Sequence, residues 1–157
     1  MADASIPPDL PSNLPDWIRE HVRRYLESDG ADGHLWDSSF AGGPGVVPTL
    51  LLTTTGRKSG KPKLLPLIYG KTDGGYAIVA SKGGAPEHPA WYLNLTAQPE
   101  VAVQVEAKRF RARARTLAGA ERRAVWDQMV EIYAPYTEYQ QRTEREIPVV
   151  VLEPIED

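Results

Sequence analysis

With 157 residues, of which 41% are hydrophobic, the chain is long enough for one domain with a core of ordinary size. It contains no cysteine, which excludes disulfides, thiolate nucleophiles, thiolate-bound zinc and iron–sulfur clusters. The formal net charge of -3 argues against a general nucleic-acid-binding protein. No apolar run approaches the ~20 residues that span a bilayer, and no signal-peptide pattern opens the chain, so we expect a cytoplasmic protein.

The first third of the chain predicts one helix between two irregular segments. Residues 1–15 hold several prolines and no periodicity, which predicts a flexible N-terminal arm before a single domain, residues 16–157. From Asp16 to Ser28, apolar residues recur at helical spacing beside three arginines. Residues 29–48 are rich in Gly, Asp and Pro, which is typical of a connection.

The rest of the chain contains mostly consecutive strand patterns. Six strands are predicted, at residues 49–55, 64–69, 76–81, 101–105, 109–116 and 149–152. Three further helices are predicted, at residues 89–95, 120–133 and 136–145. Because strands and helices do not alternate regularly, a doubly wound parallel sheet is disfavoured. The pattern favours an α+β fold, a small and mostly antiparallel barrel of about six strands with helices packed outside.

Positive charge is concentrated between the first two predicted strands. Residues 56–63, Gly-Arg-Lys-Ser-Gly-Lys-Pro-Lys, carry four cations and no carboxylate, although the whole chain is negative. This arrangement is favourable if an anion binds there, because glycines let backbone N–H groups turn toward it. Arg57 is suited to clamp a phosphate with two hydrogen bonds, and Lys58 and Lys63 are suited to act as point charges. The alternative is a charged hairpin tip that only keeps the protein soluble.

Two later segments offer further candidate binding residues. Residues 81–85, Ser-Lys-Gly-Gly-Ala, form a second candidate anion site after a predicted strand. Trp91 is suited to stack on a flat ring, and Asn94 lies about one helical turn later on nearly the same face. The alternative for Trp91, that it only packs its helix onto the barrel, has equal weight.

A cluster of tyrosines marks the junction between the last two predicted helices. Tyr133, Tyr136 and Tyr139 lie on either side of Pro135, which ends the preceding helix. Their rings are suited to bind a flat substrate, and their hydroxyls are suited to donate a proton. Packing in the core is the alternative, and it is expected for at least one of the three.

Several common catalytic sites are excluded by spacing. The hairpin glycines and lysine do not match the phosphate-binding loop of nucleotide triphosphatases, and no helix follows them. No serine lies in the nucleophile elbow of serine hydrolases. The three histidines, His21, His34 and His88, are too scattered to suggest a metal site.

Taken in order, these motifs resemble those of the deazaflavin-dependent nitroreductases, actinobacterial enzymes that use reduced coenzyme F420. The matching segments are residues 50–60, 65–70, 78–84, 88–94 and 133–136, and the resemblance covers roughly residues 45–153. It implies the FMN-binding-like split β-barrel, with which the predicted element order is compatible. It also implies an oxidoreductase that transfers hydride from the deazaflavin to a flat, electron-poor acceptor, namely a quinone, an activated enone or a nitroaromatic compound.

The resemblance also implies roles for individual residues. The coenzyme's phosphate and carboxylate tail is implied to bind Arg57, Lys58, Ser59 and Lys63, the last of which stands where family members commonly have arginine. The residues implied to contact the rest of the coenzyme are Leu64, Leu65, Pro66, Leu67, Ile68, Val79, Ala80, Ser81, Lys82, Trp91 and Asn94. On the acceptor side, Tyr136, Tyr133 and Ser81 are implied to be catalytic and Tyr139 to bind substrate. Tyr136 is expected to orient the substrate or to donate a proton, and Ser81 is expected to be a second donor.

Other functions stay open on the same fold. An FMN-dependent reductase would use the same cationic hairpin, and a non-catalytic protein would bind the coenzyme or a lipid. The tyrosine cluster favours an enzyme, because coenzyme storage needs no acceptor pocket. No nucleic acid and no protein partner is indicated. The helix over residues 16–28 is amphipathic and basic enough for weak contact with the inner face of the cell membrane, but we expect its apolar face to pack on the barrel.

Overall fold

The computed structural model describes residues 15–39 and 42–155, so that the predicted N-terminal arm lies outside the described residues except for Pro15. The helices in this part of the chain are α1 (Asp16–Glu27), α2 (Ala90–Ala97), α3 (Gly119–Ile132) and α4 (Pro135–Gln141), with a short 3₁₀ turn, η2 (Lys82–Gly84). The strands are β1 (Leu35–Asp37), β2 (Val46–Thr55), β3 (Pro62–Ile68), β4 (Gly70–Thr72), β5 (Gly75–Val79), β6 (Glu100–Val105), β7 (Lys108–Thr116) and β8 (Val149–Pro154).

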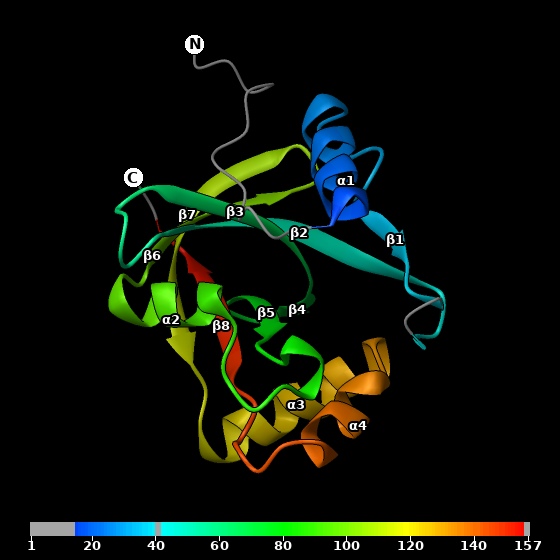
Figure 1. Cartoon of the computed structure of the whole chain (residues 1–157), viewed down its shortest axis with the longest axis vertical. Helices are drawn as coiled ribbons and strands as arrows, with labels where there is room; N and C mark the ends of the chain where they lie inside the picture. The colour runs from blue at the N-terminus through cyan, green and yellow to red at the C-terminus, as the bar shows by residue number, and fades with distance from the viewer. Residues whose placement is uncertain (1–14, 40–41, 156–157) are drawn as a thin grey trace.

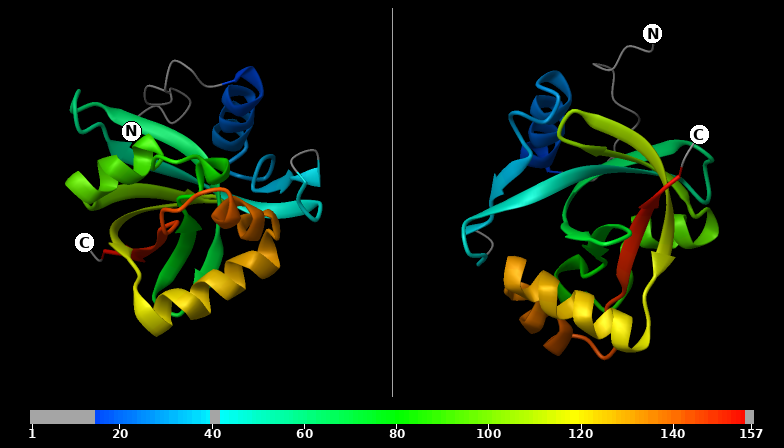
Figure 2. Two further views of the ribbon diagram at one scale, coloured as in Figure 1. Left: turned by 60° about the horizontal axis from the view of Figure 1, so that its bottom comes forward. Right: turned by 180° about the vertical axis from the view of Figure 1, so that it is seen from behind.

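The strands form one curled antiparallel sheet. The order along it is β1-β2-β6-β7-β8-β5-β4, and β3 pairs with β2. Figures 1 and 2 show that the sheet curls into an open half-barrel and that the helices lie outside it. Helix α1 packs on β3, α2 on β2, and α3 on β4, β5 and β8. The predicted α+β architecture, an antiparallel barrel with helices packed outside, is therefore confirmed.

The structure has two strands more than the sequence predicted. Strands β1 and β4 span three residues each, too few for an alternating pattern to stand out. Strand β1 lies inside the Gly- and Asp-rich connection and pairs with the start of β2, which therefore begins at Val46 rather than at Thr49. Strand β5 ends at Val79 rather than at Ser81, and the last predicted helix ends at Gln141 rather than at Arg145.

Two apolar clusters hold the layers together. The barrel interior is filled from several strands, with Leu50, Ile78 and Leu152 fully buried. The second cluster lies where α3 covers the sheet, and it joins Met129 to Val149 and to the rings of Tyr133 and Tyr136. Burial of apolar area at this level is the main favourable contribution to folding. The second cluster also fixes the tyrosines that the sequence singled out.

Helix α1 is attached to the barrel through Tyr25. The Tyr25 ring is fully buried beside Leu51 and Leu64. Its hydroxyl lies 3.1 Å from the Thr49 carbonyl, to which it donates, and it accepts a hydrogen bond of 2.8 Å from the Glu106 N–H. Burial raises the pKa of Tyr25 to about 12, so the hydroxyl stays a donor at neutral pH.

We expect Tyr25→Phe to lower the free energy of unfolding by about 1–3 kcal/mol, because the Glu106 N–H loses its acceptor in a partly buried position. Urea unfolding followed by circular dichroism measures the change. The matched control is Tyr92→Phe, whose hydroxyl bonds Thr116 at the surface and is expected to matter by less than about 0.5 kcal/mol. Equal losses in the two variants would contradict this role of the Tyr25 hydroxyl.

Candidate active site

A cavity of about 340 Å³ lies between β3, the end of β5, the segment after it, and α4. Residues from α1 and β1 complete its rim. The residues from the predicted site that line it are Pro66, Leu67, Ile68, Val79, Ser81, Lys82, Trp91, Tyr133, Tyr136 and Tyr139. The fold thus brings three segments that are distant in sequence, β3, residues 79–91 and residues 133–139, to one cavity.

One wall of the cavity is mostly apolar. Pro66, Leu67 and Ile68 supply it from β3, which pairs with β2 alone among the described strands. Trp91 joins this cavity from the first turn of α2, which Pro89 precedes, and only 7% of its surface is exposed. Apolar walls with a few polar groups are typical of pockets for flat organic ligands and cofactors.

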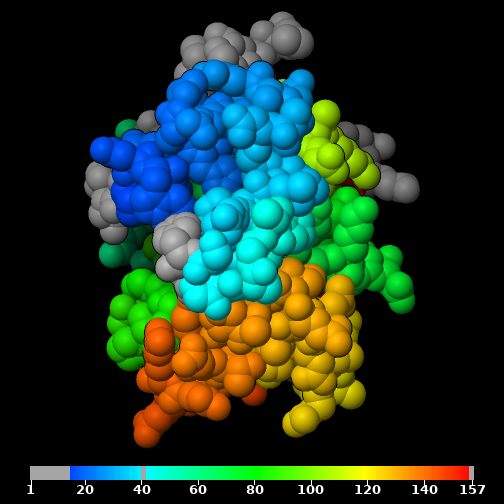
Figure 3. Space-filling model, turned by 90° about the vertical axis from the view of Figure 1, so that its right-hand side faces the viewer, coloured from blue at the N-terminus to red at the C-terminus, as the bar shows by residue number. Residues whose placement is uncertain are grey.

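The tyrosine wall is built by the break between α3 and α4. Pro135 begins α4, so Tyr136 and Tyr139 turn toward Tyr133, whose ring lies 4.9 Å from that of Tyr136, nearly edge-on. The hydroxyls of Tyr133 and Tyr139 lie 3.0 Å apart, within hydrogen-bond distance. Gly43, in the β1–β2 connection, lies so close that an added Cβ would be 2.7 Å from the Tyr133 ring. Figure 3 shows this connection (cyan) directly against α4 (orange).

The Tyr136 hydroxyl differs from its neighbours because none of the described residues forms a hydrogen bond with it. Tyr136 is 4% exposed and lines the cavity. Burial, followed by the nearby Tyr133 and Tyr139, raises the pKa of Tyr136 far above its ordinary value. The phenol therefore stays protonated, and its donor capacity is available to a ligand.

Five residues that line the cavity were not predicted from the sequence. Trp17, Ile18 and His21 come from α1, Trp36 from β1 and Thr49 from β2. Trp17 and Trp36 stack with ring centroids 5.8 Å apart and planes only 5° from parallel. The sequence carries one signal for them: two tryptophans lie in polar segments where no predicted core strand accounts for them.

The cationic hairpin is joined to the cavity through α2. Asn94, 4% exposed, accepts hydrogen bonds from the Arg57 backbone N–H at 3.1 Å and from its Nη1 at 2.9 Å. Its amide group also donates to Thr54 Oγ1 at 3.3 Å. The Nε and Nη2 donors of Arg57 have no partner among the described residues and remain for an anion. No described carboxylate pairs with Arg57, Lys58 or Lys63.

The remaining residues of the predicted site lie elsewhere. Ser59 Oγ accepts a hydrogen bond from the Lys61 N–H within the hairpin, at 3.1 Å. Leu64 is buried under α1, and Leu65 packs against the barrel interior. Ala80 is fully buried. Lys82, by contrast, is one of the residues that line the cavity, and its ammonium group forms an ion pair with Glu87 at 2.9 Å. Asn94 is placed behind the cavity, where it holds the hairpin instead of lining the pocket with Trp91.

Comparison with known proteins places this arrangement in one family. Residues 17–154 match the model of the F420H(2)-dependent quinone reductases. An F420H(2)-dependent quinone reductase of Mycobacterium tuberculosis is 41% identical over 138 residues, which cover 86% of this chain and 88% of the relative.

Solved structures agree with this match. One, described as an F420-H2 dependent reductase, is 50% identical with a TM-score of 0.63, over 68% of this chain and 94% of the other. A second, described as a domain-swapped dimer, is 46% identical with a TM-score of 0.66, over 88% of this chain and 98% of the other. The resemblance carried by the sequence motifs is confirmed, and the chain belongs to the F420H(2)-dependent quinone reductase family.

Proposed function

We propose that the protein is an oxidoreductase that uses reduced coenzyme F420 to reduce a quinone. The observation that carries this proposal is a mostly apolar cavity that is lined by Tyr136, whose hydroxyl bonds none of the described residues, and that is connected to a cationic hairpin through Asn94 and α2. Activated enones and nitroaromatic compounds have the same flat, electron-poor character and are secondary candidate acceptors. An FMN-dependent reductase and a non-catalytic coenzyme- or lipid-binding protein are disfavoured by the family match.

The described residues fit a deazaflavin with an anionic tail. The cavity volume of about 340 Å³ accommodates part of a large ligand, as expected when a ring is enclosed and a tail leaves. In this proposal Arg57, Lys58, Ser59 and Lys63 hold the tail, and the β3 wall, Val79 and Trp91 hold the ring. The hairpin cations lack described carboxylate partners, which supports an anion as their ligand.

The protein's own part in the reaction is positioning and proton supply. The bound coenzyme supplies the hydride. A quinone that accepts a hydride becomes a hydroquinone anion, which one proton converts to the hydroquinone. Tyr136 donates a hydrogen bond to the oxygen on which negative charge grows, and Ser81 is the second donor. Tyr133, Tyr139 and the stacked tryptophans at the rim hold the flat acceptor against the coenzyme and exclude water.

Tryptophan fluorescence tests this function directly, because three of the four tryptophans line the cavity: Trp17, Trp36 and Trp91. We expect saturable, low-micromolar quenching by oxidised F420 and none by FMN at the same concentrations. Trp91→Phe should remove a large part of the quenching, whereas Trp126→Phe, outside the cavity lining, should remove little. Tight binding of FMN alone, or no oxidation of reduced F420 by any quinone, would contradict the proposal.

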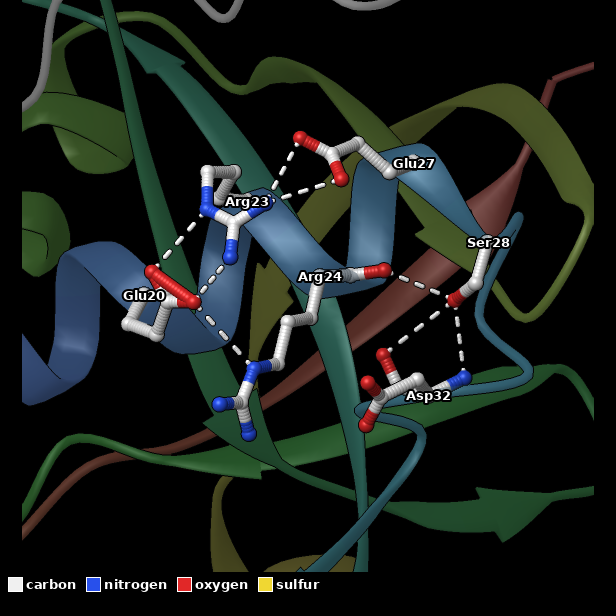
Figure 4. Close-up of polar contacts among 6 residues, drawn as sticks. All are labelled: Glu20, Arg23, Arg24, Glu27, Ser28 and Asp32. Carbon is white, nitrogen blue, oxygen red and sulfur yellow. Dashed lines mark hydrogen bonds and ion pairs between the residues drawn. The ribbon is translucent and has the colours of Figure 1, made fainter.

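Peripheral membrane contact through residues 16–28 receives little support from α1. Figure 4 shows its exposed face: Glu20 pairs with Arg23 and Arg24, and Arg23 also pairs with Glu27 at 2.8 Å. Arg23 and Arg24 are thus paired with carboxylates of the same helix, and the apolar face of α1 is buried on the barrel by Val22 and Tyr25. In residues 15–39 and 42–155, none of the helices has the length and apolar character needed to cross a bilayer. The cytoplasmic location stays a prediction from the sequence.

A further inference from the structure

The segment that carries Ser81 into the cavity has an unusual backbone. Lys82, Gly83 and Gly84 follow one another with φ values of 45°, 63° and 84°, all in the left-handed region. Glycine adopts this conformation freely, but lysine does so at a cost in conformational energy. Such a backbone persists only where the surroundings impose it. Contacts with the rest of the protein must therefore hold this segment in place.

Arg145 supplies most of the polar contacts that hold the segment. Its Nε donates to the Ala85 carbonyl at 2.9 Å and its Nη2 to the Ser81 carbonyl at 2.9 Å. Its Nη1 donates to the Ala80 carbonyl at 3.3 Å and to His88 Nδ1 at 3.0 Å. One planar guanidinium thus spans both ends of the turn, which a lysine with a point-like ammonium would not do.

His88 is a suitable partner for this contact only while it is neutral. Burial and then the charge of Arg145 lower the pKa of His88, which keeps its Nδ1 an acceptor at neutral pH. No described carboxylate forms an ion pair with Arg145. All the hydrogen bonds that its side chain makes with described residues therefore end on residues 80–88.

Arg145 is in turn attached to the tyrosine wall. Gln140, in α4, donates to the Arg145 carbonyl at 2.8 Å and accepts from the Ile147 N–H at 2.9 Å. The turn also meets α4 directly, because a Cβ added to Gly84 would lie 2.7 Å from the Tyr139 carbonyl oxygen. Arg142 adds a hydrogen bond to the Gly83 carbonyl at 3.3 Å. Residues 80–88, which carry Ser81, are therefore held directly against α4, which carries Tyr136 and Tyr139.

We propose that Arg145 is a positioning residue, which sets the distance between Ser81 and the tyrosines by fixing residues 80–88 against α4. The proposal rests on the proposed function, because Ser81 and Tyr136 are taken to act on the same acceptor. Arg145 itself does not line the cavity. Without its guanidinium, the turn relaxes from its strained backbone, and Ser81 and Lys82 leave the geometry that the reaction needs.

Arg145→Ala tests this role. We expect kcat to fall by about ten- to a hundredfold, since small displacements at a reacting centre have effects of this size, with a smaller change in the KM for coenzyme. Guanidinium ion, at concentrations far below those that unfold the protein, should restore part of kcat saturably in this variant only. Arg145→Lys should recover less than guanidinium does, because its ammonium cannot reach both ends of the turn. Arg123→Ala, an exposed arginine of α3, is the matched control.

Hydrogen exchange gives a readout that does not depend on activity. Arg145→Ala should exchange faster in residues 80–88 and at the start of α4, while β2 and β6 exchange as in the unsubstituted protein. An unchanged kcat, a loss of kcat that only follows unfolding, or unchanged exchange in residues 80–88 would overturn the proposal. If the unsubstituted protein does not oxidise reduced F420 at all, the proposed function fails, and the exchange measurement alone decides the role of Arg145.

Discussion

Tyr136→Phe is expected to lower kcat for quinone reduction by about a hundredfold, the lower range for loss of a general acid, and to leave coenzyme affinity nearly unchanged. The ring stays, so its contacts with Tyr133 and Trp126 are kept, while the hydroxyl that no described residue engages is lost. Steady-state kinetics with reduced F420 and a water-soluble quinone measure kcat, and fluorescence titration measures coenzyme binding.

Tyr76→Phe is the control for this prediction, because it removes a tyrosine hydroxyl from β5 outside the cavity lining. We expect it to change kcat little. Since the pKa of Tyr136 lies far above neutrality, its protonation should add no step to the pH profile of kcat between about pH 6 and 9. Equal kcat in Tyr136→Phe and the unsubstituted protein would contradict the role of this hydroxyl as proton donor.

A structural feature can be predicted from the sequence where a single continuous segment forms it. The break at Pro135 predicts that tyrosines gather at a helix junction, and the structure places all three there, at the cavity. The charge pattern of residues 56–63 locates the hairpin for a similar reason, since β2 and β3 flank it directly. Strands β1 and β4 were not predicted, because three residues are too few to show a periodic pattern.

Prediction from the sequence fails where a structural feature depends on two segments that come together only in the folded protein. Trp17 of α1 and Trp36 of β1 stack on each other at the cavity, and neither segment encodes this pairing by itself. The partners of Arg145 are mostly backbone carbonyls, and every residue type offers one. Asn94 could be assigned to a pocket from its position on α2, but its actual partner, Arg57, is known only once α2 packs beside the hairpin.

The contact between Asn94 and Arg57 predicts that coenzyme affinity depends on a residue outside the cavity lining. Arg57→Met should raise the coenzyme dissociation constant by about ten- to a hundredfold, because a hydrogen bond to a charged group contributes roughly 1.5–3 kcal/mol. Asn94→Leu should raise it by about tenfold, since Arg57 loses the acceptor that fixes its backbone N–H and Nη1. Fluorescence titration with oxidised F420 measures both variants, and circular dichroism checks their folding.

The double variant separates positioning from direct contact. If Asn94 acts through Arg57, the combined effect of Asn94→Leu and Arg57→Met on the dissociation constant is smaller than the product of the single effects. Lys71→Met, which removes an exposed cation from β4, should leave affinity unchanged, so that loss of net charge alone is not the cause. Affinity should also fall with added salt, and less steeply in Arg57→Met. Full additivity of the two substitutions would show that Asn94 supports coenzyme binding by a route that does not involve Arg57.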